Sequence, residues 1–271
     1  NSPDYLKDLP ESTQIIDNSA FMRGDALNLI DNIEEESIDL IVTDPPYGID
    51  GAGKEQLYNR NPNNVIQGYV EISQDRYQQF SDIWIKKASQ VLKPGGSMYI
   101  FSGYTNLYEI LGALRKTGLK EINHIIWKYN FGVYTRKKFV SSHYHLLYYT
   151  KPGADPTFNT YCRYGQQEKD QQGGKLNYQD REDVWVINKE YKPDQMKNQN
   201  ELPTDLLTKI IRYSSNPGDL VADFFLGGFN TPRVARGLDR KAVGCEAVPQ
   251  VFENGLKRLA KYNKGYLTDK V

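Results

Sequence analysis

Apolar segments of two different periods alternate along this chain. Short runs with the length and composition of β-strands are separated by longer stretches in which apolar residues recur every three or four positions. The strand candidates are residues 38–44, 97–102, 122–129, 143–150, 220–225 and 242–246. The helix candidates are residues 76–92, 106–116, 204–214, 232–238 and 248–262. This alternation predicts an α/β fold, a doubly wound and mostly parallel sheet with helices on both faces.

Size and composition narrow the class of protein. The 271 residues suffice for one large α/β domain, and 39% hydrophobic residues can form a packed soluble core. No apolar run approaches the length of a membrane-spanning helix, and no signal-like segment begins the chain. Cys162 and Cys245 lie far apart, which argues against a disulfide framework or a cysteine zinc site and favours a reducing, cytoplasmic setting. Because the formal net charge is zero, any contact with a polyanion must come from local patches.

Two long polar stretches interrupt the alternation. Residues 48–75 are turn-rich, and residues 152–200 contain the low-complexity run GQQEKDQQGG at 165–174. Both could be ordinary surface loops. Loops of this length are uncommon inside a compact domain and often form lids or binding elements. We therefore expect a mobile loop at 48–75 and a small inserted recognition element at about 152–200.

The run TDPPYG at 43–48 closes the first strand candidate. Two prolines have a fixed φ and no backbone N–H, so they form a stiff bend that keeps the Pro45 carbonyl pointing one way. Asp44 adds a carboxylate, and Tyr47 adds a flat ring. The tetrad Asp44-Pro45-Pro46-Tyr47 would present two fixed hydrogen-bond acceptors and a stacking surface. Taken alone, it is equally compatible with a plain Pro-rich turn.

A second motif, VADFFLGGFNTPRVARGL at 221–238, has the pattern of a strand, a glycine turn and a helix. Gly227 and Gly228 allow a tight turn and a close approach of the backbone to a ligand. Thr231 can cap the following helix. The next strand ends on Glu246, and an acid at that place suits a ribose diol. A glycine pair is weak evidence alone, but this order of elements indicates a nucleoside-containing cofactor.

Together the two motifs resemble those of amino-group methyltransferases that use S-adenosylmethionine, whose usual cofactor loop reads D-x-F-x-G-S-G-T. The residues that match this loop are Asp223, Phe225 and Gly227. The residues that depart from it are Gly228, Phe229 and Asn230. The tetrad precedes the loop by about 180 residues, an order that resembles the permuted beta class of DNA adenine-N6 methyltransferases. Methyltransferases of protein glutamine or RNA generally carry the glycine loop first, and no such loop precedes the tetrad here.

The resemblance covers nearly the whole chain and implies one Rossmann-like methyltransferase domain over residues 1–271, with a circularly permuted motif order. It implies S-adenosylmethionine as cofactor and makes residues 152–200 a target-recognition insertion. The cofactor-binding residues it implies are Asp25, Asp223, Phe225, Gly227, Gly228, Asn230, Thr231, Glu246 and Asn198. Asp25 could equally be a helix N-cap, and Asn198 stands where the family often has a histidine.

The implied partner is DNA. The run YTRKKF at 134–139 places Arg136, Lys137 and Lys138 beside aromatic residues, a pattern suited to phosphate contacts. Lys54, in the first long loop, joins this set, although charge runs are more often solvated faces. A homodimer and a cognate restriction endonuclease stay open as further partners. The resemblance implies neither a metal nor a membrane.

In that family the tetrad serves as an amine clamp. The exocyclic amine of adenine is a poor nucleophile because its lone pair is delocalised into the ring. Hydrogen bonds from the amine to Asp44 and the Pro45 carbonyl would pull the nitrogen towards sp³ geometry for direct in-line methyl transfer. A base inside a duplex must first flip out, and Tyr47 would stack on it, a contact of roughly 1–3 kcal/mol.

Two alternatives remain at this point. Cytosine-N4 methylation uses the same clamp, although an Asp at the first position leans towards adenine by resemblance. Phe229, a bulky residue where the loop usually has glycine, motivates a non-catalytic nucleic-acid-binding homologue. Because Gly227 and Gly228 can shift the tight turn by one residue, we expect the Phe229 ring to turn into the core between the strand and the following helix and leave the cofactor pocket open.

Overall fold

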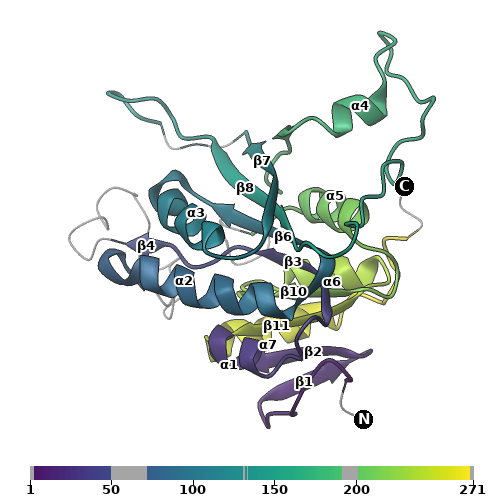
Figure 1. Cartoon of the computed structure of the whole chain (residues 1–271). Coiled ribbons are helices and arrows are strands. Elements are labelled where there is room, and N and C mark those ends of the chain that lie inside the picture. The colour runs from purple at the N-terminus through teal and green to yellow at the C-terminus, as the bar shows by residue number, and fades with distance from the viewer. Residues whose placement is uncertain (1–2, 50–71, 131, 133, 191–200, 269–271) are drawn as a thin grey trace.

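The computed structural model describes residues 3–49, 72–130, 132, 134–190 and 201–268. A nine-stranded sheet crosses the molecule in the order β1-β2-β11-β10-β3-β6-β8-β7-β9 (Figure 1). Its strands are β1 (Thr13–Ile16), β2 (Ser19–Arg23), β3 (Ile38–Thr43), β6 (Leu92–Ser102), β7 (Lys120–Lys128), β8 (His143–Thr150), β9 (Val184–Val186), β10 (Leu220–Asp223) and β11 (Lys241–Glu246). A separate two-stranded sheet joins β4 (Gly48–Ile49) to β5 (Ile72–Ser73).

The centre of the large sheet is parallel and its flanks are mixed. Strands β2, β11, β10, β3 and β6 run parallel to one another. Strand β8 is antiparallel to both β6 and β7, β1 is antiparallel to β2, and β9 is parallel to β7. The expected doubly wound α/β sheet is therefore confirmed. Strands β3 and β10, which carry the two sequence motifs, are direct neighbours in it.

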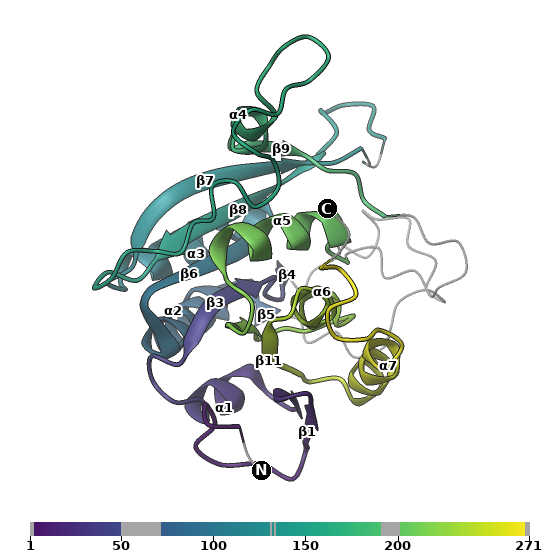
Figure 2. The same ribbon diagram turned by 90° about the vertical axis from the view of Figure 1, so that its right-hand side faces the viewer.

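Helices cover both faces of the sheet (Figures 1 and 2). The helices of one layer are α1 (Ala26–Asp31), α2 (Gln74–Val91) and α3 (Leu107–Arg115), and those of the other are α5 (Thr204–Ser214), α6 (Asn230–Gly237) and α7 (Pro249–Leu259). Strand β3 contributes side chains to both layers, because successive side chains of a strand point to opposite faces of the sheet. Ile41 packs with the first layer, whereas Leu40 and Val42 pack with the second. A short 3₁₀ turn, η3 (Tyr104–Asn106), precedes α3.

The second long polar stretch is described over residues 152–190. It contains α4 (Leu176–Asp180), which stands away from the sheet in Figures 1 and 2, and β9, which extends the sheet beyond β7. The low-complexity run forms a compact turn in which the Asp170 carboxylate accepts hydrogen bonds from the backbone N–H groups of Gln172 and Gly174. Asp180 fixes this segment to α5 through the Tyr213 hydroxyl at 2.7 Å. Most of the loop expected at 48–75 lies outside the described residues.

Candidate active site

The two sequence motifs meet at the carboxyl ends of β3 and β10. The Thr43 hydroxyl donates a buried hydrogen bond of 2.9 Å to Oδ1 of Asp223, across 180 positions of sequence. The backbone N–H of Phe225 donates to the same oxygen at 3.1 Å. Ligands of open parallel sheets bind in this region, outside the strand ends. Asp223 therefore links the end of the tetrad strand to the start of the glycine loop.

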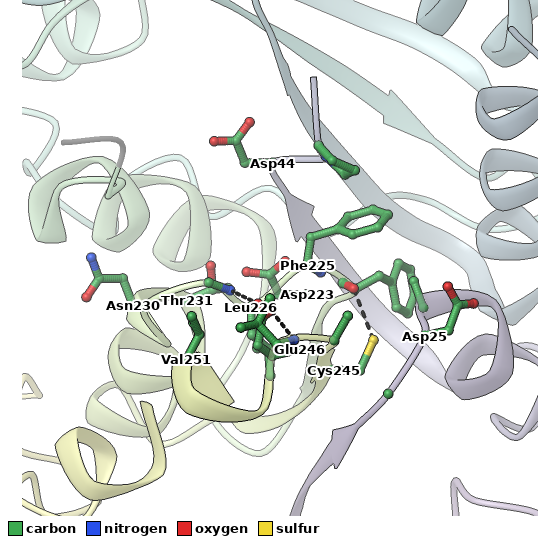
Figure 3. A pocket seen from close by; sticks show the side chains of 18 of the residues that line it. Asp25, Asp44, Asp223, Phe225, Leu226, Asn230, Thr231, Cys245, Glu246 and Val251 are labelled. Atoms are coloured by element: carbon green, nitrogen blue, oxygen red, sulfur yellow. Dashed lines mark hydrogen bonds between the residues drawn. The ribbon is translucent and has the colours of Figure 1, made fainter. Parts of the chain in front are cut away.

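A cavity of about 240 Å³ opens between these strand ends (Figure 3). Asp44 and Pro46 of the tetrad line it from one side. The predicted cofactor residues that line it are Asp25, Asp223, Phe225, Gly227, Gly228, Asn230, Thr231 and Glu246. Asn198, the remaining predicted cofactor residue, lies outside the described part of the chain. Folding thus gathers eight positions, spread from residue 25 to residue 246, around one space.

Glu246 shapes the glycine loop as well as lining the cavity. Its Oε2 accepts the backbone N–H of Gly227 at 3.0 Å, and its Oε1 accepts that of Val248 at 2.9 Å. Burial raises the pKa of this carboxyl, and the two backbone donors oppose the rise. Each carboxylate oxygen still has a lone pair for a further donor. Glu246 can therefore hold the loop and accept a hydroxyl group of a ligand at the same time.

Close packing explains the glycine at position 228. A Cβ atom there would collide with Oε1 of Glu201, a cavity residue that the sequence patterns did not single out. Glu201 is held in place by an ion pair of 2.6 Å with Arg258 and by the side-chain amide of Asn230 at 3.2 Å. The loop backbone therefore lies directly on a fixed carboxylate, which leaves no room for a side chain at Gly228.

The sequence offered Asp25 and Thr231 as helix N-caps, and the structure bears out the first alone. Asp25 does both of the things considered for it, because its Oδ1 accepts the Leu27 N–H at 2.8 Å as the N-cap of α1 and the residue also lines the cavity. The expected cap at Thr231 is wrong. Helix α6 begins at Asn230 with Phe229 as its N-cap, so Thr231 lies in the first turn. Its hydroxyl instead hydrogen-bonds Asp223, whose pKa is raised by burial.

The ring of Phe229 lies in the core and not in the cavity. It packs against Phe21 of β2 and Phe252 of α7, with ring centroids 5.5 and 5.7 Å apart, and is 1% exposed. The residue has a φ of 62°, so it takes the left-handed conformation that glycine usually fills. The expectation that the ring turns inward is confirmed. Its aromatic partners belong to β2 and α7, whereas we expected the ring between β10 and the following helix.

Hydrogen bonds hold the tetrad in place from several sides. The Tyr77 hydroxyl donates to the Pro46 carbonyl at 2.9 Å, and the Gly48 N–H donates to Oδ1 of Asn106 at 3.0 Å. The Tyr47 hydroxyl donates to Oδ1 of Asp44 at 3.2 Å. Burial raises the pKa of Asp44 to about 7; the Tyr47 hydrogen bond opposes this rise and the Asp223 charge adds to it. The sequence suggested only a stacking role for Tyr47, so its hydrogen bond to Asp44 is an addition.

A second, smaller cavity lies on the tetrad. It measures about 10 Å³ and shares Asp44 and Leu202 with the large cavity. Its other lining residues are Tyr47, Phe101, Trp127, Tyr144 and Lys189. The Trp127 and Tyr144 rings stack with centroids 5.7 Å apart. Asp44 therefore faces both an acid-rich cavity and an aromatic one.

The predicted phosphate contacts lie far along the β7–β8 connection. Arg136, Lys137 and Lys138 are all exposed, and beside them Tyr134 and Phe139 are 80% and 99% exposed. This connection extends beyond the end of the sheet in Figure 1. Lys54, the other predicted contact, is outside the described residues. The exposed cations beside large exposed rings suit a polyanion with stackable bases.

Two further properties concern the described residues as a whole. None of their helices is both long enough and apolar enough to cross a bilayer. Within those same ranges, no group of three or more His, Cys, Asp or Glu side chains is arranged to hold a metal ion.

Comparisons with known proteins agree with this geometry. The family described as DNA methylase matches residues 38–257. The DNA adenine methyltransferase YhdJ of Escherichia coli is 31% identical over 252 residues, which are 88% of this chain and 81% of that protein.

Two solved structures share the fold. TTHA0409 of Thermus thermophilus, complexed with S-adenosyl-L-methionine, has a TM-score of 0.66 at 21% identity and covers 89% of this chain and 93% of its own. The cytosine-N4-specific PvuII DNA methyltransferase has a TM-score of 0.70 at 18% identity and covers 93% and 89%. The family match runs from β3 to α7 and includes both motifs, as the sequence led us to expect. The chain therefore belongs to the DNA methylase family.

Proposed function

We propose that this DNA methylase transfers a methyl group from S-adenosylmethionine to the N6 amine of adenine in DNA. The observation that carries the proposal is the position of Asp44 on the boundary of two cavities. One is rich in carboxylates and lies at the glycine loop, and the other is lined by aromatic rings. A single acid can thus meet an amine of a stacked base beside a bound methyl donor.

The large cavity fits this cofactor chemically. S-adenosylmethionine carries a sulfonium cation, an ammonium group and a ribose diol. The acids that line the cavity are Asp25, Asp44, Glu201, Asp223 and Glu246, and no Lys or Arg is among the described residues that line it. The apolar wall includes Phe80, Phe225 and Val251. Such a set favours a cationic ligand with a flat apolar part.

Individual residues take the roles that the resemblance assigned. Glu246 would hold the ribose hydroxyls, Asp223 and the glycine loop the methionine part, and Asp25 the adenine end. When bound, the cofactor supplies an electrophilic methyl group. Because the binding residues belong to β10, β11, the turns after them and the start of α6, with Asp25 in the turn after β2, the site is largely built before a ligand arrives.

The tetrad would prepare the nucleophile. The Asp44 carboxylate accepts one N6–H of adenine and the Pro45 carbonyl accepts the other, which draws the nitrogen towards sp³ geometry. Tyr47 stacks on the base and, through its hydroxyl, orients Asp44. Transfer would break the bond between the methyl group and the sulfonium sulfur, leave a neutral thioether and form the new N–C bond, and the nitrogen would have to lose one proton. The Asp44 carboxyl, with a pKa of about 7, is matched to accept that proton at neutral pH.

Adenine is proposed over cytosine for two reasons. The first tetrad position is Asp44, which by family resemblance leans towards adenine. YhdJ of Escherichia coli, which is 31% identical over 88% of this chain, is named a DNA adenine methyltransferase. The likeness to the cytosine-N4-specific enzyme, at 18% identity, concerns the fold alone.

Nucleoside mass spectrometry tests the proposal directly. DNA from a methylation-deficient host that expresses the protein should contain N6-methyladenine, and DNA from the same host with Asp44→Ala should lack it. N4-methylcytosine in its place would refute the choice of base. Absence of either methylated base, together with no S-adenosylmethionine binding by calorimetry, would support the non-catalytic alternative.

The proposal also covers the two long polar segments, the location of the protein and its partners. Residues 152–200 would recognise the target sequence, supported by the exposed Tyr178 ring of α4, and residues 48–75 would form a mobile loop. A cytoplasmic location, a homodimer and a cognate restriction endonuclease complete it. Hydrogen exchange with and without DNA tests both segments, since unchanged exchange would make them ordinary surface loops.

Activity should depend on the ionisation of Asp44. The clamp needs the carboxylate, and burial raises its pKa to about 7, so the rate should rise with pH through this value and level off above it. Tyr47→Phe removes a hydrogen bond that lowers the pKa, so the rise should move to higher pH. The measurement is the initial rate at low concentrations of both substrates, which reports the free protein. An unchanged profile in Tyr47→Phe would show that the hydroxyl does not tune Asp44.

A further inference from the structure

The small cavity beside Asp44 holds a lysine that neither sequence motif contains. Lys189 follows β9 and places its ammonium group over three rings. The Nζ atom lies 4.4 Å from the ring centroid of Tyr129, 5.4 Å from that of Tyr144 and 6.0 Å from that of Trp127. A cation at these distances is attracted by the negative faces of the rings. The ammonium therefore covers ring faces at the small cavity that Asp44 and Tyr47 also line.

The charges of Lys189 and Asp44 also shift each other's pKa. Burial lowers the pKa of Lys189, and the charge of Asp44 opposes that fall. The lysine in turn counteracts part of the rise in the pKa of Asp44. Among the described residues that line the small cavity, Asp44 is the single carboxylate and Lys189 the single cation. The cavity thus places one strong acceptor and one strong donor near each other.

This pair complements the edge of an aminated base. In adenine, the N6 amine donates hydrogen bonds, and two nearby ring nitrogens accept them: N1, which is bonded to C6, and N7, which is bonded to C5. A carboxylate for the amine and an ammonium for a ring nitrogen would satisfy both groups. Guanine and thymine carry a carbonyl oxygen where adenine has its amine, and that oxygen would face the Asp44 carboxylate without a hydrogen bond.

We propose that Lys189 is a base-binding residue that donates a hydrogen bond to a ring nitrogen of the target adenine while Asp44 holds its amine. This inference rests on the proposed function and names a second group that would hold the edge of the base. A cavity of about 10 Å³ holds no more than about one water molecule. A base must therefore displace the ammonium from the ring faces. The four-carbon stem of lysine allows that movement.

The test combines a variant with base analogues. Lys189→Met keeps most of the apolar stem and removes the donor, and Lys120→Met, an exposed lysine at the far end of β7, is the matched control. The substrates are duplexes with adenine, 1-deazaadenine or 7-deazaadenine at the target position found by methylation mapping. Each analogue keeps the amine and lacks one ring nitrogen.

The expected result is that removing the Lys189 ammonium and removing the ring nitrogen have non-additive effects on kcat/KM. With the wild-type protein, one analogue should lower kcat/KM by about 10- to 100-fold, the usual effect of losing a charged hydrogen bond. Lys189→Met should show a similar loss on adenine and little further loss on that analogue. Lys120→Met should behave as wild type. Cofactor affinity by calorimetry and the melting temperature should be unchanged in both variants.

Several outcomes would overturn the inference. Full wild-type activity on both analogues would exclude the hydrogen bond without any variant. Equal loss from Lys189→Met on all three bases would show a structural role, and no loss on adenine would show no role. If the wild-type protein methylates adenine and any of these occurs, only the inference fails. If it leaves adenine unmethylated, the proposed function fails as well.

Discussion

Asp44→Ala is expected to lower kcat for methyl transfer by about 100- to 1000-fold, the range for removing one fixed polar group that acts on the transition state. Asp44 touches both cavities, but the other acids of the large cavity remain in the variant. Cofactor affinity should therefore change far less than kcat. Single-turnover methylation of DNA and calorimetric titration with S-adenosylmethionine measure the two quantities separately.

Two further variants sharpen this experiment. Glu253→Ala removes an exposed acid on α7 and should leave the rate unchanged. Asp44→Asn keeps the shape and one carbonyl acceptor, so its loss should be smaller than that of Asp44→Ala. Wild-type rates in Asp44→Ala would rule out the clamp.

The ionisation of Asp44 should make stability fall as the pH rises, whereas it should make activity rise. Burial raises the pKa of Asp44 from 3.8 to about 7, so the folded state favours its protonated form. The stabilisation is present below the unfolded pKa and is lost as the pH rises through about 7. Asp44→Asn should therefore be more stable than wild type at pH 8, and the difference should shrink towards pH 5. Thermal melts at both pH values check the sign.

The central strands and large helices were predictable because their signals are local. Helix α5 has the bounds expected from its apolar period, Thr204–Ser214. Strand β6 begins at Leu92, earlier than expected, because Leu92 already pairs with Ile38 of β3. The backbone N–H groups of Gly95 and Lys151 add pairing with the chain after β8. The Pro-Gly-Gly run that normally signals a turn forms an irregularity within this strand, where the register with β3 shifts and Gly95 has a φ of 76°. Tertiary pairing therefore extends the strand across a run that keeps its local irregularity.

The edge strands were missed for a related reason. Strands β1 and β9 have four and three residues, too few for a periodic signal. Each is extended because a longer strand beside it offers backbone partners. The sequence motifs, in contrast, predicted eight lining residues of the large cavity. Adjacent parallel strands bring their carboxyl ends together, so a motif at each strand end implies one shared site.

Sequence motifs of this kind could not predict the aromatic cavity. Trp127 belongs to β7, Tyr144 to β8, and Lys189 to the segment after β9. Their proximity depends on the pairing of β7 with both other strands. The nearest sequence signal is the high tyrosine content, 20 residues, which does not say which rings share a cavity. Residues that long-range strand pairing brings together have no fixed spacing in the sequence by which they could be recognised.

Phe229→Gly is expected to lower the free energy of unfolding substantially without improving cofactor binding. Deleting a buried aromatic side chain costs about 3–5 kcal/mol. Glycine relieves the left-handed backbone conformation at φ 62°, a gain of about 1–2 kcal/mol. The net loss should be about 1–4 kcal/mol, measured by urea denaturation. A variant that keeps its stability and binds S-adenosylmethionine much more tightly would show that the ring restricts the cofactor cavity.

A second substitution makes this prediction specific to one contact. Gly255 of α7 lies under the Phe229 ring so closely that an added Cβ would overlap ring atoms. Gly255→Ala alone should therefore destabilise the protein, although alanine in a helix is normally favoured over glycine by about 1 kcal/mol. In the Phe229→Gly background the overlap is gone, so the same change should become stabilising and fill part of the space. A double-mutant cycle measures this change of sign. Equal effects of Gly255→Ala in both backgrounds would place the Phe229 ring elsewhere than against α7.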